Sequence, residues 1–419
     1  MRQKKGLRVL SLFDGMSCGQ IALRDLGIPI EVYYASEIDK FAIQQTQLNF
    51  PDTVQLGDVR NIDVDKLCDE VGEFDLLLAG SPCVNLSFAG KRAGLATKEN
   101  MEILTLGQYL DLKEADFEFE GQSYLFWEFM RILKDLQKRN PKVLFLLENV
   151  EMGKKWETVL SGAIGIHGVH INSALVSAQN RKRIYWSNIR VREEGLFGYK
   201  YTDIPQPADR GILLRDILEK EVDERYFLSD KMLSWLKRHG EKLNHKMKIL
   251  NDEDKTKCVT ATASFNMNLT SNYVCVAMRG RNPENPSSRK SGIKTVQMLE
   301  PAEEGKTNCL TTVAKDNLIL TNDHLQKNLT DVNGKANAFL ATSHKGAWAN
   351  GMSLVEEKKN DTRYRIRRLT PTECARLQTV PDWYIWNCSA TQQYRMLGNG
   401  WTVEVIKHIF SFMRLEDTV

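Results

Sequence analysis

The chain has 419 residues and a mass of 47.9 kDa, more than the ~250–300 residues that one hydrophobic core usually supports, so we expect two domains. Its 42% hydrophobic and 26% charged residues are typical of a globular protein and exclude disordered and collagen-like chains. No stretch approaches the ~18 uninterrupted apolar residues of a membrane-spanning helix, and the N-terminus lacks the apolar core of a secretory signal. The net charge, 57 − 54 = +3, neither requires nor excludes a nucleic-acid partner. We therefore expect a cytoplasmic protein that does not bind membranes.

The N-terminal half of the chain alternates short apolar runs with amphipathic segments of helical length. The predicted strands are Leu7–Phe13, Val32–Ile38, Phe74–Ala79, Val143–Glu148, Ile171–Val176 and Arg183–Ile189. The predicted helices are Gln20–Leu26, Lys40–Asn49, Val64–Val71 and Tyr124–Arg139. This alternation is typical of βαβ units, so we predict an α/β fold with a mainly parallel sheet covered on both faces. Ligands of such sheets bind beyond the carboxyl ends of the strands.

The composition changes near Pro205, after which Asn, Thr, Ser and Lys are frequent and long helical patterns become rare. Residues 206–368 are therefore predicted to form a smaller, irregular, β-rich domain. Helical character returns at Thr370, which opens the capping-box sequence T-P-T-E, and a last amphipathic helix is predicted at Val403–Met413. The predicted large domain combines residues 1–205 and 369–419.

Glycines and acidic residues stand at the carboxyl ends of the predicted strands. The segment Phe13–Gly19, F-D-G-M-S-C-G, follows the first strand and opens a helix, where glycines let the backbone approach a ligand. Glu37 ends the next strand, at about the distance from the turn at which an acid binds ribose hydroxyls, and Asp58 follows in G-D-V. The diphosphate fingerprint G-x-G-x-x-G is absent, so the pattern favours a nucleoside cofactor without a pyrophosphate. The alternative is a tight turn without a ligand.

Three further polar segments are candidates for chemistry. Cys83, in the rigid sequence A-G-S-P-C, ends an apolar strand and can present a nucleophile there; a buried structural cysteine is the alternative. Glu148 ends a buried apolar run, which is costly unless the carboxylate has partners or a function. Arg181 and Arg183, in Q-N-R-K-R, suit a contact with a base or a phosphate, and equally a solvated strand edge. Since the cysteines form no C-x-x-C pair and the histidines have no metal-binding spacing, we predict no metal site.

Together and in this order, these segments resemble the DNA (cytosine-5-)-methyltransferase family, in its bacterial or phage form. The resemblance covers about three fifths of the chain, and its motifs are F-D-G-x-x-x-G, S-P-C, E-N-V, Q-x-R-x-R, R-L-T-P, R-L-Q, P-D-W and L-G-N-G-W-T-V. Several of these motifs are also similar to those in the catalytic domains of mammalian de novo DNA methyltransferases. The chain departs from many members of the family after Cys83, where Val84 and Asn85 stand in place of Gln. This difference leaves the base-flipping contacts of the loop open.

The resemblance implies a Rossmann-like S-adenosylmethionine-dependent methyltransferase domain with a target recognition domain at residues 206–368. It implies methyl transfer from S-adenosyl-L-methionine to carbon 5 of a flipped-out cytosine, with attack of Cys83 on C6. The implied catalytic residues are Cys83, Glu148, Arg181 and Arg183. The implied cofactor-binding residues are Phe13, Asp14, Gly15, Gly19, Glu37, Ile38, Asp58, Val59, Pro82, Asn399 and Trp401. The implied DNA-binding residues are Asn85, Ser87, Gln179, Arg279, Arg281, Arg365 and Arg367.

The implied partner is duplex DNA with a cytosine-containing recognition sequence. We expect a monomer in a bacterial cell or a phage-infected host, acting either as an orphan enzyme or beside a cognate restriction endonuclease. Two alternatives stay open: a tRNA cytosine-5 methyltransferase, and a catalytically inactive DNA-binding relative with a regulatory role.

The charge distribution agrees with a DNA-binding domain in the middle of the chain. Residues 1–205 carry 25 − 28 = −3, residues 206–368 carry 28 − 21 = +7, and residues 369–419 carry 4 − 5 = −1. The basic excess therefore lies in the domain assigned to DNA. An acidic insert, Asp111–Glu120, is predicted to form a solvated loop outside the duplex.

Overall fold

The computed structural model describes residues 6–82, 95–99, 101–119, 121–226 and 364–414, together with five short strands between residues 275 and 350. For all strands from residue 275 to residue 368 it describes the backbone alone. Cys83, Asn85 and Ser87 lie outside the described residues. Within the described part of the chain, no helix is both long enough and apolar enough to cross a bilayer.

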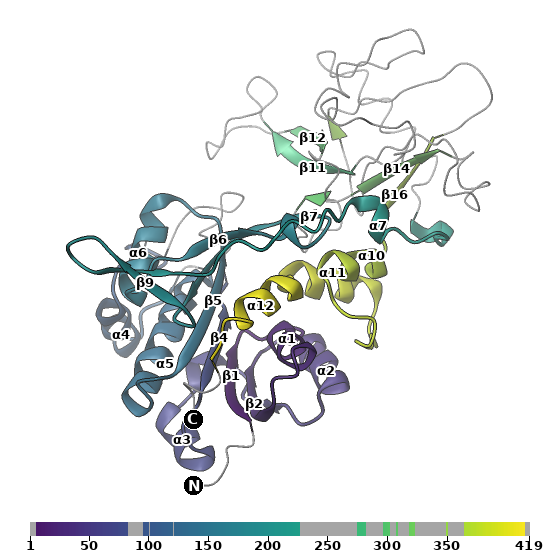
Figure 1. Cartoon of the computed structure of the whole chain (residues 1–419). Coiled ribbons are helices and arrows are strands. Elements are labelled where there is room, and N and C mark those ends of the chain that lie inside the picture. The colour runs from purple at the N-terminus through teal and green to yellow at the C-terminus, as the bar shows by residue number, and fades with distance from the viewer. Residues whose placement is uncertain are drawn as a thin grey trace.

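A seven-stranded sheet forms the centre of the protein, with the strand order β3-β2-β1-β4-β5-β8-β6 (Figure 1). Its strands are β1 (Leu7–Leu12), β2 (Ile30–Ser36), β3 (Val54–Gln55), β4 (Leu76–Gly80), β5 (Leu144–Val150), β6 (Val169–Asn172) and β8 (Lys182–Ser187). The strands from β3 to β5 are parallel, whereas β8 runs antiparallel to both β5 and β6. The predicted α/β fold with a mainly parallel sheet is confirmed, and its one antiparallel strand was not predicted.

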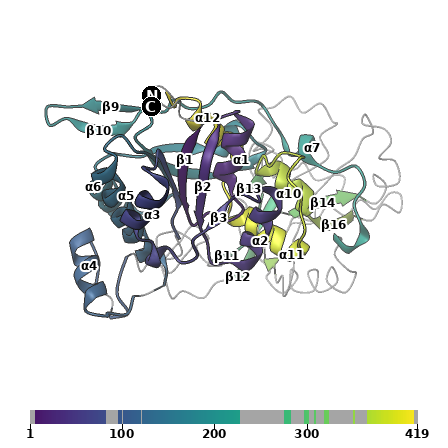
Figure 2. The same cartoon turned by 90° about the horizontal axis from the view of Figure 1, so that it is seen from below.

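Helices cover both faces of this sheet (Figures 1 and 2). One face carries α3 (Val64–Val71), α5 (Phe126–Arg139) and α6 (Lys154–Ile164). The other carries α1 (Cys18–Asp25), α2 (Lys40–Asn49), α10 (Pro371–Leu377), α11 (Ala390–Asn399) and α12 (Val403–Phe410). The sheet is therefore doubly wound, and the C-terminal helices complete a face that the N-terminal helices begin.

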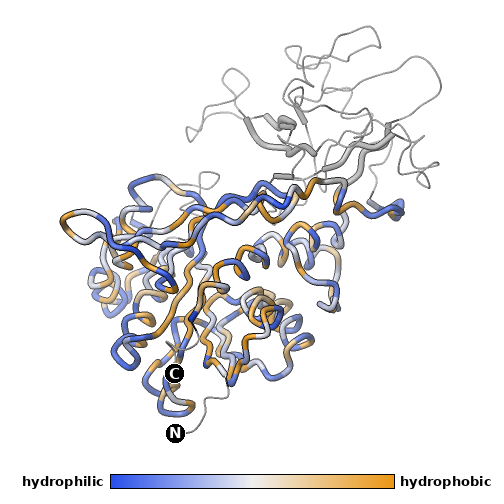
Figure 3. The backbone as a smooth tube through the Cα atoms, viewed as in Figure 1, coloured by the Kyte–Doolittle hydropathy of each residue, from blue (hydrophilic) through white to orange (hydrophobic). Residues whose placement is uncertain are grey.

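Alternation along each central strand supplies two hydrophobic cores. In β4, Leu76 and Leu78 belong to the core under α1 and α12, whereas Leu77 and Ala79 belong to the core under α5. All four side chains are completely buried. Because both faces of a parallel strand are covered, its sequence is continuously apolar rather than alternating. Figure 3 shows this as hydrophobic colour along the central strands.

Several elements differ from the prediction. The structure adds α4 (Leu106–Glu114) and α6, which were not predicted, so the acidic insert begins as a helix rather than a loop. The predicted strand Ile171–Val176 is wrong in its second half, because β6 ends at Asn172. There the Asn172 side chain accepts a hydrogen bond from Ala174 N at 3.1 Å and starts a 3-10 turn. The remaining short elements are β9 (Val191–Glu194), β10 (Tyr199–Thr202) and α7 (Leu214–Ile217).

The helix predicted at Thr370 is confirmed with its cap. Thr370 Oγ1 accepts a hydrogen bond from Glu373 N at 3.2 Å, and Glu373 Oε2 accepts one from Thr370 N at 2.8 Å. The predicted last helix is also present, although α12 ends at Phe410. The apolar side chains of α12 join the same core as those of α1.

A second sheet lies between residues 275 and 368, with the order β15-β12-β11-β14-β16. Its strands are β11 (Cys275–Arg281), β12 (Val296–Pro301), β14 (Leu318–Asn322), β15 (Ala349–Asn350) and β16 (Tyr364–Arg368). A separate pair, β13 (Thr307–Asn308) with β7 (Gln179–Asn180), links this region to the first half of the chain. The boundaries of the recognition domain at 206 and 368 stay a prediction.

Candidate cofactor and catalytic site

The turn between β1 and α1 contains residues in the left-handed region of backbone conformation. Phe13, Gly15 and Ser17 have φ values of 57°, 58° and 66°. A side chain at Gly15 would meet no atom within 4 Å, so backbone conformation rather than space favours glycine there. Asp14 N donates a hydrogen bond to Ser36 O at 3.2 Å, which holds the turn against the end of β2.

Glu37, directly after β2, has both carboxylate oxygens engaged by backbone donors. Its Oε2 accepts a hydrogen bond from Gly15 N at 2.8 Å. Its Oε1 accepts from Ile38 N at 2.7 Å and from Asp39 N at 2.8 Å. The structure therefore brings Gly15, Glu37 and Ile38 together, as the predicted cofactor site requires. The side chain of Ile38 is 67% exposed and leaves an apolar surface beside this carboxylate.

Asp14 has an acceptor atom that the described residues leave open. Tyr33 Oη donates to its Oδ1 at 2.8 Å, whereas its buried Oδ2 has no hydrogen-bond partner in the described part of the chain. Burial raises the pKa of Asp14 to about 6, although hydrogen bonds from Ser11, Ser17 and Tyr33 lower it. Since a buried acceptor without a donor is costly, a positively charged donor on a ligand would stabilise this site.

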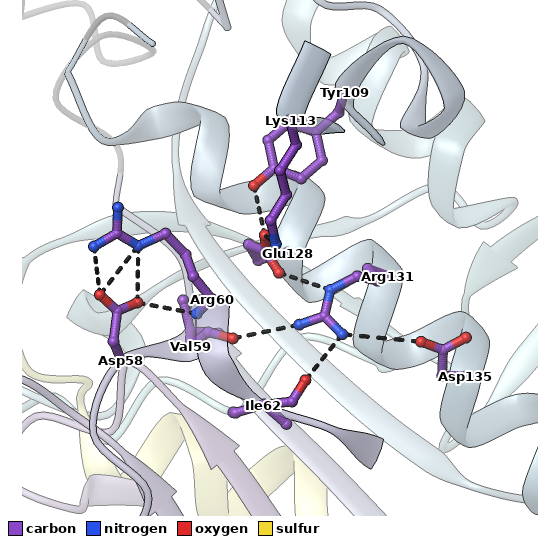
Figure 4. A network of polar contacts seen from close by, with 9 residues as sticks. All are labelled: Asp58, Val59, Arg60, Ile62, Tyr109, Lys113, Glu128, Arg131 and Asp135. Atoms are coloured by element: carbon purple, nitrogen blue, oxygen red, sulfur yellow. Dashed lines mark hydrogen bonds and ion pairs between the residues drawn. The ribbon is translucent and has the colours of Figure 1, made fainter. Parts of the chain in front are cut away.

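Asp58 and Val59 follow β3 and begin the 3-10 turn Val59–Asn61. The carboxylate of Asp58 accepts hydrogen bonds from Arg60 N at 3.0 Å and from Arg60 Nε at 3.0 Å (Figure 4). The side-chain hydrogen bond from Arg60 holds the pKa of Asp58 below its ordinary value. Sequence reasoning missed Arg60, for which the only signal was its position two residues after the acid.

Glu148 and Arg183 lie on the neighbouring strands β5 and β8 and form an ion pair. Arg183 Nε lies 3.0 Å from Glu148 Oε1, and the two side chains are 13% and 10% exposed. On the other side, Glu148 is the register partner of Gly80 in β4. Asn149 Nδ2 donates to Ser81 Oγ at 3.0 Å and so fixes the start of the S-P-C segment. Glu148 and Asn149 thus connect Ser81, directly after β4, to Arg183.

Arg181 and Gln179 are buried supports of the C-terminal segment. The Arg181 side chain, with the residue 2% exposed, donates to Gly398 O at 3.3 Å and Gly400 O at 2.8 Å. Gln179 is completely buried, and its Nε2 donates to Leu377 O at 2.7 Å. The alternative of a solvated strand edge is therefore wrong for Arg181. The catalytic role of Arg181 and the DNA contact of Gln179 stay predictions.

Trp401 packs against two of the glycines at the strand ends. A β-carbon at Gly80 would lie 2.8 Å from Trp401 Nε1, and one at Gly19 would lie 3.6 Å from Trp401 Cζ3. Trp401 is 8% exposed, whereas Asn399, the last residue of α11, is exposed. The C-terminal motif therefore lies beside the start of α1 and the end of β4.

The predicted DNA-binding arginines belong to the second sheet. Arg279 and Arg281 lie in β11, Arg365 and Arg367 lie in β16, and β14 pairs with both strands. Because alternate residues of a strand share a face, Arg279 and Arg281 lie on one face of β11, and Arg365 and Arg367 lie on one face of β16. Their side chains are outside the described part of the structure.

A buried cluster around Glu128 was missed from the sequence. Glu128 lies in α5, and Tyr109, Lys113 and Arg131 surround its carboxylate (Figure 4). The signal for this cluster was an acidic residue inside the apolar run F-W-E-F-M of a helix.

The profile of the C-5 cytosine-specific DNA methylase family matches residues 7–159 and 172–414, which include all of the candidate site residues described above. The chain belongs to this family. The family, the Rossmann-like fold and the enzyme class predicted from the sequence, a DNA (cytosine-5-)-methyltransferase, are thereby confirmed.

Individual relatives agree with the assignment of this methylase. The orphan methyltransferase M.SPRI of Bacillus phage SPR is 28% identical over 96% of this chain and 96% of that protein. The type II methyltransferase M.HgiCI of Herpetosiphon aurantiacus is 25% identical over 96% of each. Among solved structures, S. pombe Dnmt2 has a TM-score of 0.50 and 16% identity, over 97% of this chain and 98% of that one. The Entamoeba histolytica methyltransferase EhMeth has a TM-score of 0.51 and 13% identity, over 98% of both. These two structures show the fold alone.

In this methylase the polar groups collect where the strand order reverses. Starting from β1, the chain adds β2 and β3 on one side of the sheet and then β4 and β5 on the other side. The point at which the strand order reverses therefore lies between β1 and β4. Ligands of doubly wound sheets bind in the crevice at such a switch. The glycine turn and Glu37 lie on one side of it, and Glu148 with Arg183 lies on the other.

Proposed function

We propose that this methylase transfers a methyl group from S-adenosyl-L-methionine to carbon 5 of a cytosine flipped out of a specific duplex DNA sequence, through a covalent bond between Cys83 and C6. The observation that carries the proposal is the ion pair of Glu148 and Arg183 at the carboxyl end of β5. It lies one strand from Ser81, which opens the S-P-C segment. The family assignment supports cytosine C5 as the target atom.

The chemistry explains why these residue types are needed. Carbon 5 of cytosine is a poor nucleophile, and addition of the Cys83 thiolate to C6 makes C5 enamine-like. Glu148 accepts a hydrogen bond from the amino group of the base and, in its protonated form, donates one to N3, which offsets the negative charge that develops on the ring. Arg183 holds the carbonyl side of the base. After methyl transfer, the C5 proton leaves to a base and the Cys83 thiolate is expelled, which restores the aromatic ring.

The DNA must be opened for this attack, because C6 is not accessible inside a duplex. Flipping the target nucleotide costs a few kcal/mol, which contacts to the rest of the site must offset. We assign sequence reading to residues 206–368, where β11 carries two arginines and β16 carries three. Such side chains suit contacts with phosphates and with base edges in a groove.

For the cofactor we propose the crevice between the ends of β1 and β4. The glycine turn brings backbone close to a ligand, and Glu37 and Asp58 are suited to the hydroxyl and amino groups of a nucleoside. The open Oδ2 of Asp14 fits the ammonium group of an amino-acid moiety. The bound cofactor supplies an electrophilic methyl group, and these residues bind and orient it.

Replacing Cys83 tests the covalent mechanism. We expect Cys83→Ser to reduce transfer of radiolabelled methyl to duplex DNA by roughly 10³-fold or more, since the covalent step loses its nucleophile. Binding of S-adenosylhomocysteine, measured by calorimetry, stays unchanged. Cys388→Ser, which alters a half-buried free cysteine elsewhere, is the matched control and keeps full activity. Full activity of Cys83→Ser would contradict the mechanism.

Two further measurements decide the substrate and the biological setting. Methyl transfer to tRNA in preference to duplex DNA would replace the DNA proposal, and cofactor binding without transfer to either would favour an inactive DNA-binding relative. Bisulfite sequencing of DNA from expressing cells identifies the target sequence. Comparing that sequence with the cleavage sites of neighbouring endonucleases then distinguishes an orphan enzyme from a partner in restriction and modification.

A further inference from the structure

A buried charged network connects the helix α4 to α5. The side chain of Glu128, in α5, is 0% exposed. Tyr109 Oη and Lys113 Nζ, both from α4, lie 2.5 Å from its Oε1 (Figure 4). Arg131 Nε lies 2.8 Å from its Oε2. Because a carboxylate removed from water is stable only with such donors, these contacts fix Glu128 between the two helices.

Arg131 extends this network to the segment after β3. Its two remaining nitrogens donate to Ile62 O at 3.0 Å and to Val59 O at 3.4 Å. These carbonyls lie on either side of the turn that Asp58 caps. The guanidinium is planar, so with Nε held by Glu128 its other N–H groups point in fixed directions. The position of the turn is thereby coupled to a buried carboxylate in α5.

Aromatic side chains make a second connection to the same turn. Phe119, which follows α4, stacks on Tyr124 with ring centroids 4.4 Å apart and planes at 21°. The pKa of Arg60 is raised, first by its hydrogen bond with Asp58 and further by Tyr124. Both connections therefore run from the region of α4 to the segment Asp58–Ile62.

We propose that Glu128 and Arg131 are positioning residues for cofactor binding, which hold the segment Asp58–Ile62 in its binding position, and that Lys113 and Tyr109 complete this support. The inference rests on the proposed function, because it takes the first two residues of that segment as cofactor contacts. Neither Glu128 nor Arg131 is a catalytic residue in this account. Arg131 acts through backbone carbonyls, and Glu128 acts through Arg131.

The physical reason is preorganisation. A segment already held in its bound position loses little conformational freedom when a ligand binds. Without Arg131, the carbonyls of Val59 and Ile62 lose a shared donor, and the ligand must order the turn itself. Removal of the network therefore weakens cofactor binding, whereas the methyl-transfer step, which takes place at the other side of the crevice, keeps its rate once the cofactor is bound.

The decisive experiment is Arg131→Met in the full chain. We expect the Kd for S-adenosylhomocysteine and the KM for S-adenosylmethionine to rise about tenfold, while kcat at saturating cofactor stays within about twofold of wild type. An unchanged Kd overturns the proposal. A fall in kcat with an unchanged KM also overturns it, because the effect would then be on the chemistry and not on binding.

Arg139→Met is the matched control, since it removes the same charged group from the same helix. Arg139 pairs with Asp69 at 2.8 Å and with Glu73 at 3.2 Å, so it contacts α3 and the loop after it rather than the Asp58 turn. We expect its loss to lower the melting temperature slightly and to leave the Kd unchanged. If it weakens cofactor binding as much as Arg131→Met does, general destabilisation is the cause and the proposal is wrong.

Milder variants keep the test decisive if Arg131→Met does not fold. Lys113→Met removes one of the three donors to Glu128, and we expect a two- to threefold rise in Kd. Glu128→Gln retains an acceptor for Arg131 without the charge, and a rise in Kd smaller than that of Arg131→Met is expected. Wild-type affinity in both overturns the proposal. If the wild-type protein itself does not bind S-adenosylhomocysteine, the proposed function fails, which is a different result from equal binding by all variants.

Discussion

Three carboxylates near the strand ends differ in the hydrogen bonds, ion pairs and burial that surround them. Hydrogen bonds from Arg60 lower the pKa of Asp58, so it stays ionised. Glu148 is compensated by an ion pair with Arg183. The Oδ1 of Asp14 accepts a hydrogen bond from Tyr33, and burial raises the pKa of Asp14 to about 6 despite its hydrogen bonds. The protonation of Asp14 is therefore expected to change near neutral pH.

Asp14 makes stability depend on pH in a defined direction. Its pKa is about 6 in the folded protein and 3.8 as an ordinary value, so between these values the folded state binds the proton more tightly. The protonated Asp14 therefore stabilises the folded state relative to the unfolded state. This contribution is complete below about pH 4 and is lost as the pH rises through about 6. Asp14→Asn keeps an acceptor for Tyr33 but never ionises. We expect the melting temperature of this variant, relative to wild type, to rise between about pH 4 and pH 7. A difference that does not change with pH would contradict the burial of Asp14.

At the scale of elements, periodicity and caps predict much of the fold, and tertiary contacts decide the rest. The strands β1, β2, β4 and β5 follow from continuous apolar runs, and the start of α10 follows from its capping box. The helix α4 buries Tyr109 alone of its residues, so its apolar pattern is weak and its contact with α5 supplies the support. Glu148 and Arg183 were predicted as site residues. Their ion pair depends on the antiparallel register of β5 and β8, which no local pattern contains.

The junction between β4 and the C-terminal motif is tight enough to test. A β-carbon at Gly80 would lie 2.8 Å from Trp401 Nε1, closer than side chains normally approach. We expect Gly80→Ala to lower the free energy of unfolding by about 1–3 kcal/mol, as other overpacked sites do. Urea unfolding measures this change, and the Kd for S-adenosylhomocysteine is expected to rise with it. Gly107→Ala in α4 is the control, because no atom lies within 4 Å of the added carbon. Equal stability of the two variants would show that the packing at Trp401 is looser.

At the scale of the whole molecule, segments from both ends of the chain pack around the central sheet. Tyr384 Oη donates to Met16 O at 2.9 Å, and the hydroxyls of Ser173 and Thr402 lie 2.8 Å apart. The order of motifs predicted this return of the chain, but not the contacts that hold it. The buried side chain of Arg181 is one of them, since it binds the carbonyls around the last glycine motif. The predicted recognition domain thus lies in the sequence between two parts that together form most of the core under α1 and α12, whereas the core under α5 comes from the first part alone.

The uneven charge of the chain predicts how DNA binding responds to salt. Residues 206–368 carry +7 and the rest of the chain carries −3 − 1 = −4, so contacts with phosphates are expected mainly from the inserted domain. For the double variant Arg365→Gln/Arg367→Gln we expect weaker DNA binding. The slope of the logarithm of the DNA-binding constant against the logarithm of the salt concentration is expected to become shallower by up to about 1.8, which is about 0.9 for each phosphate that an arginine no longer neutralises. Fluorescence anisotropy of a labelled duplex across a salt series measures the slope. Lys138→Gln/Arg139→Gln removes the same charge from the end of α5, where Asp135 and Asp69 already pair with these residues, and leaves the slope unchanged. An equal decrease of slope in both variants would mean that net charge, and not an arginine-bearing strand of the inserted domain, determines DNA binding.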